Sequence, residues 1–267
     1  MIHSIQRIKV MFLRYFYLHR RSVSRTLELF FWPVMELLVW GFMSIYIQTI
    51  AGPVYKGFGY IINGMIFWDV LYRSQQGVTL SIVEDIWSQN IVNLLISPLK
   101  LWEWMVATFL YGVLKTMAIT TILAILALLL YHFNLVGSMG LKLVPFMGSL
   151  LLFGWGLGVL TSGLLIRWGN AVQALIWGIP FLIQPFSAIY YPLSILPEWA
   201  QFFSRLIPST FIFEGVRSVL DSGQINWGGF WISIIFNMIF FIFASMFFYW
   251  MYFLSRISGR LGRLGMD

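Results

Sequence analysis

Apolar stretches long enough to cross a lipid bilayer recur along most of the chain. Each of them exceeds the roughly 20 residues that a transmembrane helix needs. They occupy residues 27–50, 58–82, 104–131, 142–166, 170–191 and 229–254. Because backbone polar groups in hydrocarbon must be paired within their own segment, each stretch is expected to be a helix. The sequence therefore predicts an all-α integral membrane protein with six transmembrane helices.

The composition supports the same class. Of the 267 residues, 60% are hydrophobic and 10% are charged, whereas a soluble domain is about 25% charged. The predicted transmembrane domain covers residues 27–254, and residues 255–267 follow as a short tail. Cysteine is absent, which excludes disulfides, thiolate metal sites and a thiol nucleophile.

The basic residues indicate how the helices are oriented. The net charge is +7, but Lys and Arg collect near the two ends of the chain, including Arg256, Arg260 and Arg263, and form no patch typical of nucleic-acid binding. If the N-terminus is cytoplasmic, six spans return the C-terminus to the cytoplasm, together with loops 83–103 and 167–169. Most Lys and Arg residues then lie inside, as the positive-inside rule requires. Both termini are predicted to be cytoplasmic.

Residues 1–26 have basic but no acidic side chains. On a helix, Arg7, Arg14, Arg21 and Arg25 share a narrow face, because steps of seven and four residues return to nearly the same angle. The segment is predicted to be an amphipathic helix in the membrane interface, with these arginines toward anionic lipid headgroups. A plain positively charged anchor is the alternative.

Two connections are too long to be simple hairpins. The first is the loop 83–103, which is amphipathic. The second, residues 190–228, is divided by Pro192, Pro197 and Pro208 into apolar pieces that are too short to span a bilayer. Pieces of that length are typical of re-entrant or interfacial segments. Two half-helices that dip back into the outer leaflet are predicted before the last span.

Ionisable residues also fall inside the predicted spans. They include Glu36, Asp69, Arg73 and Lys115. An isolated charge at the centre of a membrane helix costs about 2.5–3.5 kcal/mol on insertion scales. Asp69 and Arg73 are four residues apart on one helix, so an ion pair between them is expected. Glu36 and Lys115 lie on different spans and either pair with each other or line a polar pathway.

The fourth predicted span contains closely spaced small residues, among them Gly154, Gly156, Gly158 and Gly163. Small side chains let two membrane helices approach closely. These positions are predicted to pack against other helices of the same subunit.

Motifs for chemistry are missing. The sequence has no G-x-x-x-x-G-K-[ST] phosphate-binding loop, and His3, His19 and His132 are far apart and away from carboxylates. No catalytic residue, metal ligand or cofactor site is therefore predicted in this chain.

Three stretches together carry a family resemblance. The first span reads LELFFWPVMELLVWGFMSIYI, the loop 83–103 contains NLLISPLKLWEW, and YYPLSILPEWAQFFSRLIPSTFIFEGVRSVL precedes the last span. In this order, and over most of the chain, they resemble the permease subunits of ABC-2 type exporters. That class includes exporters of drugs, nodulation factors, and lipid-linked O-antigen and teichoic acid chains.

The resemblance implies that the loop between the second and third spans is a coupling helix, which docks in a groove of a separate ATPase subunit. The residues at which it implies this role are Glu84, Asp85, Ile91, Leu94, Leu95, Ser97 and Pro98. The residues themselves agree, because Ile91, Leu94 and Leu95 form an apolar edge and Pro98 stops the helix. An interfacial loop without a partner is the alternative.

The resemblance also implies the assembly. Two copies of the chain, or one copy with a sister permease, would surround a pathway in a bacterial or archaeal cytoplasmic membrane, in contact with its lipids. ATP and Mg would bind only to the partner ATPase. The outer exit would be shaped by Tyr191, Pro192, Pro197, Glu214 and Arg217, with Glu214 paired to Arg217.

The expected function is ATP-driven export of an amphipathic substrate, namely a lipid, a glycolipid or a hydrophobic drug. Export of a lipid-linked polysaccharide is the nearest alternative. An ATP-independent channel and an integral-membrane transferase are the alternatives from other classes.

Overall fold

The computed structural model describes residues 2–51, 57–259 and 261, without the side chains of residues 2, 51 and 95. Arg260 and Arg263 of the predicted tail lie outside this part. Within it, all regular elements are α-helices or short 3-10 turns. The α-helices are α1 (Ile2–Arg20), α2 (Val23–Ala51), α3 (Gly57–Trp87), α4 (Ile91–Ile96), α5 (Leu101–Tyr131), α6 (Leu135–Met139), α7 (Leu143–Trp168), α8 (Leu175–Ile183), α9 (Glu198–Ser204), α10 (Pro208–Ser222) and α11 (Trp227–Ile257).

Four helical segments are long and apolar enough to cross a membrane. They are Val23–Ile50, Leu101–Tyr131, Leu135–Val172 and Trp227–Ile257. Together with the composition, they make the chain an α-helical membrane protein. Helix α3 is equally long, at 31 residues, and covers the predicted span 58–82. Its sequence is more polar than theirs, and most of its residues are buried among the other helices.

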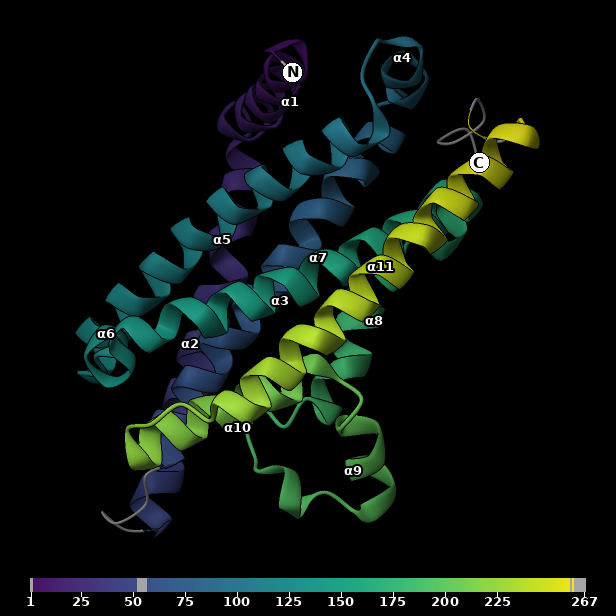
Figure 1. Ribbon diagram of the computed structural model, residues 1–267. Helices are drawn as coiled ribbons and strands as arrows, with labels where there is room; N and C mark the ends of the chain where they lie inside the picture. The colour runs from purple at the N-terminus through teal and green to yellow at the C-terminus, as the bar shows by residue number, and fades with distance from the viewer. Residues whose placement is uncertain (1, 52–56, 260, 262–267) are drawn as a thin grey trace.

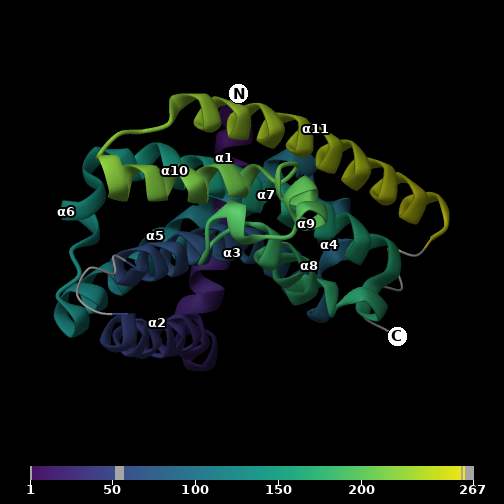
Figure 2. The ribbon, with the colours of Figure 1, turned by 90° about the horizontal axis from the view of Figure 1, so that it is seen from below.

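The long helices form one bundle around α3, which packs against α2, α5 and α7, while α11 packs along α7 (Figure 1). The start of α1, the short helix α4 and the end of α11 lie at one end of the bundle, called here the α4 end. Helices α6, α9 and α10 lie at the opposite end, called here the α9 end. In the view from below, α2 and α11 lie on opposite sides of the bundle (Figure 2).

The predicted fifth span, 170–191, is not one continuous helix. Its helical core, α8, has 9 residues and is therefore about 14 Å long, less than half of the roughly 30 Å hydrocarbon core. Pro180 lies inside α8 and has no N–H to donate to the carbonyl of Ile176. That carbonyl instead accepts hydrogen bonds from the Nε2 atoms of Gln75 at 3.1 Å and Gln76 at 3.3 Å. The broken helix is thus bonded to α3 through the carbonyl that its proline leaves unpaired.

The small residues of α7 pack inside the subunit, as predicted. A Cβ atom at Gly154 would lie 2.5 Å from the carbonyl oxygen of Leu71 on α3. On another side of α7, a Cβ atom at Gly156 would lie 2.8 Å from the ring of Phe240 on α11. Glycine therefore lets α7 contact two neighbouring helices at close range.

Candidate functional site

Helix α1 lies against α3 and α5 with arginines facing protein carboxylates. Two ion pairs make this contact: Arg7 with Glu103 at 2.7 Å and Arg14 with Asp85 at 2.5 Å. Next to them, Arg25 at the start of α2 pairs with Glu84 on α3 at 3.6 Å. Asp85 and Glu103 are fully buried, so their desolvation is offset by the guanidinium groups and by further hydrogen bonds.

This arrangement corrects the predicted orientation of α1. The sequence placed Arg7, Arg14 and Arg25 toward lipid headgroups, but the structure turns them inward. Apolar side chains such as Ile5 and Val10, which are 63% and 64% exposed, lie on the outer surface instead. The acidic partners are about 60 to 100 positions away in the sequence, and helical periodicity within residues 1–26 carries no information about them. Arg21, the fourth arginine of the predicted face, is exposed.

Buried hydrogen bonds join the same three helices. The Tyr15 hydroxyl donates to Asp85 at 2.8 Å and accepts from the indole N–H of Trp104 at 2.7 Å. Burial, and next the charge of Asp85, raise the pKa of Tyr15 well above its usual value. The hydroxyl therefore stays protonated and remains a donor to Asp85. These contacts make α1 and the ends of α3 and α5 a connected unit.

Lys115 lies about three turns after Trp104 on α5. It binds His19, which is one turn after Tyr15 on α1, rather than Glu36. Its Nζ is 3.3 Å from His19 Nε2 and 5.2 Å from the centre of the Tyr111 ring. Burial, and next the charges of Lys115 and Arg25, lower the pKa of His19 to about 3. His19 is therefore neutral at physiological pH, and its Nε2 accepts a hydrogen bond from Lys115.

The α3–α5 connection forms a tight elbow around α4. Ser97 ends the helix: its backbone is extended and its hydroxyl donates to the carbonyl of Leu94 at 2.6 Å. Pro98, which follows, cannot continue a helix and is exposed. The predicted stop at this position is thus present.

The apolar edge of α4 differs from the predicted one. Ile91 is only 3% exposed and belongs to the core, whereas Val92 and Ile96 are 43% and 79% exposed. These two residues are four positions apart and so lie on one face of the helix. Leu94 is half-buried, and the side chain of Leu95 lies outside the described residues. Glu84 and Asp85 were also assigned to coupling, but Glu84 forms an ion pair with Arg25 and Asp85 forms one with Arg14.

We call Val92 and Ile96, with the exposed Trp87 and Trp102 at the two ends of the elbow, the elbow surface. Each tryptophan is at least half exposed. None of these four residues was predicted as a site residue from the sequence. The spacing of Val92 and Ile96 was visible in the sequence, but which side of α4 is buried depends on the core cluster that Ile91 joins with residues of α1 and α5.

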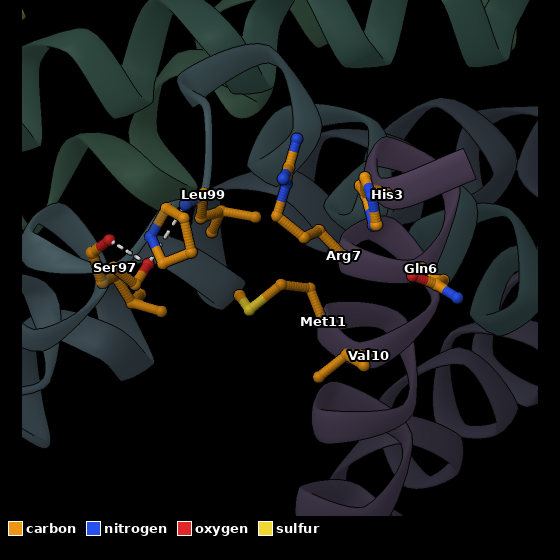
Figure 3. Close-up of a pocket in the computed structure, with 9 residues that line it drawn as sticks. His3, Gln6, Arg7, Val10, Met11, Ser97 and Leu99 are labelled. Carbon is orange, nitrogen blue, oxygen red and sulfur yellow. Dashed lines mark hydrogen bonds between the residues drawn. The ribbon is translucent and has the colours of Figure 1, made fainter. Parts of the chain in front are cut away.

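A groove separates α1 from the elbow and has a volume of about 430 Å³. Figure 3 shows the side chains that line it, from the first turns of α1 on one side and from the segment after α4 on the other. They are His3, Gln6, Arg7, Val10, Met11, Leu94, Ser97, Pro98 and Leu99. Its walls are mostly apolar and its size suits one or two inserted side chains.

At the α9 end, the predicted pair of Glu214 and Arg217 is present, with 2.6 Å between Oε1 and Nη1. Arg217 also donates to the carbonyl oxygens of Ala188 and Ile189. Glu214 accepts from the backbone N–H of Leu193 at 2.9 Å. The pair on α10 therefore holds the segment that leads from α8 to α9.

The other predicted residues of the outer exit lie in that segment. Tyr191 donates its hydroxyl to the carbonyl of Pro185. Pro192 precedes a 3-10 turn, and Pro197 precedes α9. Helix α9 has 7 residues, so the segment consists of short helical pieces, as the prolines predict.

Among the intramembrane charges, the predicted Asp69–Arg73 ion pair is present at 3.1 Å. Glu36 is half-buried on α2 and lies within electrostatic range of both Asp69 and Arg73. Sequence reasoning assigned all three to a candidate pathway, and the structure brings them together. Lys115, the fourth, is separate from them and belongs to the α4 end.

The apolar helices, with bonded polar groups at both the α4 end and the α9 end of the bundle, define an α-helical membrane protein. No protein-family model matches this chain, and no curated protein matches it in sequence.

Proposed function

We propose that the chain is the transmembrane permease subunit of an ATP-driven exporter of the ABC-2 type. It would pair with a second permease, most simply another copy of itself, and move an amphipathic substrate out of the cytoplasm or the inner leaflet. Six membrane crossings, with α8 and the following segment completing the fifth, and a re-entrant α9–α10 hairpin belong to this proposal.

The observation that supports it most is the elbow surface. Large apolar side chains, with Ile96 79% exposed, protrude at the bundle end that carries the N-terminus. A soluble partner that covers them would gain the free energy of apolar burial. Below them, the ion pairs and hydrogen bonds of α1, α3 and α5 form a rigid base. A force applied to α4 would therefore move α1 and α3 together.

Energy must come from another chain under this proposal, because the sequence has no phosphate-binding loop. A separate ATPase subunit would bind ATP and Mg, dock on the elbow surface and close during each cycle. The groove between α1 and the elbow is wide enough to receive side chains of such a partner.

The proposed orientation places the α4 end in the cytoplasm. The natural absence of cysteine lets single cysteines report it against a clean background. Glu198→Cys, exposed on α9, should react in intact cells with a membrane-impermeant maleimide, and Ser88→Cys, exposed in the elbow, should react only after lysis. Labelling of Ser88→Cys in intact cells would reverse the orientation and remove the proposed docking site.

Transport itself is tested in proteoliposomes that contain the chain and its co-purified ATPase. We expect movement of a fluorescent phospholipid or a lipophilic dye only when hydrolysable ATP is supplied. Movement at the same rate without ATP would indicate a channel, and chemical conversion of the lipid would indicate a transferase.

A further inference from the structure

Glu36 is an ionisable group in the apolar part of the bundle. It lies in the middle of α2, on the membrane-spanning segment Val23–Ile50. In the described part of the chain, no hydrogen bond or ion pair is formed by its carboxylate. An acidic side chain in this position is costly unless it is neutralised, and it is therefore typical of a functional site.

The charges around Glu36 do not balance. Arg73 is the cation in range, and it is already bonded to Asp69 Oδ1 at 3.1 Å. The other carboxylate oxygen of Asp69, Oδ2, is buried and has no hydrogen-bond partner, and Asp69 itself is 1% exposed. Two carboxylates thus have one guanidinium in range, and Arg73 is bonded to only one of them, Asp69. When both acids are ionised, one negative charge is left without a countercharge.

Aromatic side chains of α2, α3 and the segment after α8 lie near Glu36. Trp40 is one turn from Glu36 on α2 and stacks on Tyr190 with 4.2 Å between ring centres. Tyr72 on α3 lies within electrostatic range of Glu36, and the guanidinium of Arg73 lies 5.6 Å from the centre of its ring. Trp40, Tyr72 and Tyr190 are all half-buried residues. Aromatic faces attract cations, more strongly when water is excluded.

We propose that Glu36, with the rings of Trp40, Tyr72 and Tyr190, forms a binding site for an amphipathic organic cation, an amine with an apolar body. The carboxylate supplies the countercharge and accepts a hydrogen bond from the ammonium group, while the rings contact its methylene groups. Exposed apolar residues of α2 next to the site, such as Val39 and Met43, would contact the remainder of the molecule. As a statement about exported substrates, this inference rests on the proposed function; as a binding site, it does not.

The test is binding to the purified protein in nanodiscs, measured by energy transfer from tryptophan to a dansyl group. The probes are dansylcadaverine, which carries a free amine, and its N-acetylated form, which differs only by lacking the charge. Empty nanodiscs correct for partitioning into lipid. Wild-type protein should bind the amine at least about tenfold more tightly, because hydrogen bonds to charged groups are stronger than neutral ones. Equal affinities for the two probes would overturn the proposal.

Substitutions test whether Glu36 is the group that causes tighter binding of the amine. Glu36→Gln should remove it, while Glu198→Gln, which deletes an exposed carboxylate on α9, should retain it. A full preference in a folded Glu36→Gln variant would overturn the assignment. Trp40→Leu keeps the carboxylate and should weaken binding of the amine several-fold more than binding of the acetylated probe. This variant is the deciding test if Glu36→Gln does not fold. If Trp40→Leu then weakens binding of both probes equally, the proposed site is wrong.

This experiment is separable from the proposed function because it uses no ATP. Amine binding that depends on Glu36 in a protein without an ATPase partner would keep the site and remove the exporter. Co-purification of an ATPase partner, together with equal binding of the two probes, would support the exporter and rule out the amine site.

Discussion

Ile96→Asp is expected to abolish the stimulation of ATP hydrolysis by the assembled complex while leaving the chain inserted and folded. Ile96 is 79% exposed on α4, so the substitution removes no core contact. In a docked interface, it would place an unpaired carboxylate in an apolar contact, which costs several kcal/mol. The measurement is ATPase activity of the purified complex, with thermal stability recorded in parallel. The double variant Val92→Asp/Ile96→Asp should show the same loss without a further effect.

Leu141→Asp is the matched control. Leu141 is 89% exposed and lies in the connection between α6 and α7 at the α9 end, so the same type of change is made far from the elbow. It should leave stimulated hydrolysis unchanged. If Ile96→Asp also leaves hydrolysis unchanged in a complex that still contains the ATPase, the elbow surface is not the coupling element.

Gly154→Leu is expected to cause the largest loss of stability among single substitutions in α7. Its Cβ would lie 2.5 Å from the carbonyl oxygen of Leu71 and 2.7 Å from the Cβ of Ser74, so α7 and α3 would have to separate. Overpacking in a tight core costs roughly 1–3 kcal/mol and sometimes more, and this contact joins two central helices. Thermal unfolding in detergent, followed by size-exclusion chromatography, measures the effect.

The same helix offers a control. Gly148 is also in α7, but no atom lies within 4 Å of the position its Cβ would occupy. Gly148→Leu should therefore unfold at the wild-type temperature or slightly above it, because leucine has the higher helix propensity. Equal destabilisation by the two substitutions would show that α7 and α3 do not approach closely at Gly154.

The sequence was most informative where a single segment determines its own structure. Apolar length predicted the helices, four-residue spacing predicted the Asp69–Arg73 ion pair, and the prolines predicted the short pieces at the α9 end. The small residues of α7 were correctly assigned to packing within the subunit.

It was least informative where distant segments meet. The arginines of α1 were assigned to lipid because the sequence near them contains no acidic residue, yet Asp85 and Glu103 are their partners. The continuous span predicted at 170–191 ignored Pro180, whose effect is compensated by Gln75 and Gln76 from α3. In both cases the stabilising partner is supplied by another helix, and periodicity within one segment cannot reveal it.

The most direct test of the central proposal is mass spectrometry of the proteins that co-purify with the chain, tagged at its C-terminus, in mild detergent. The proposal predicts a stoichiometric ATPase with a phosphate-binding loop, present with the wild type and with Leu141→Asp and lost with Val92→Asp/Ile96→Asp. A well-folded oligomer of this chain alone, with no ATPase in any preparation, would contradict it and favour a channel or a membrane enzyme.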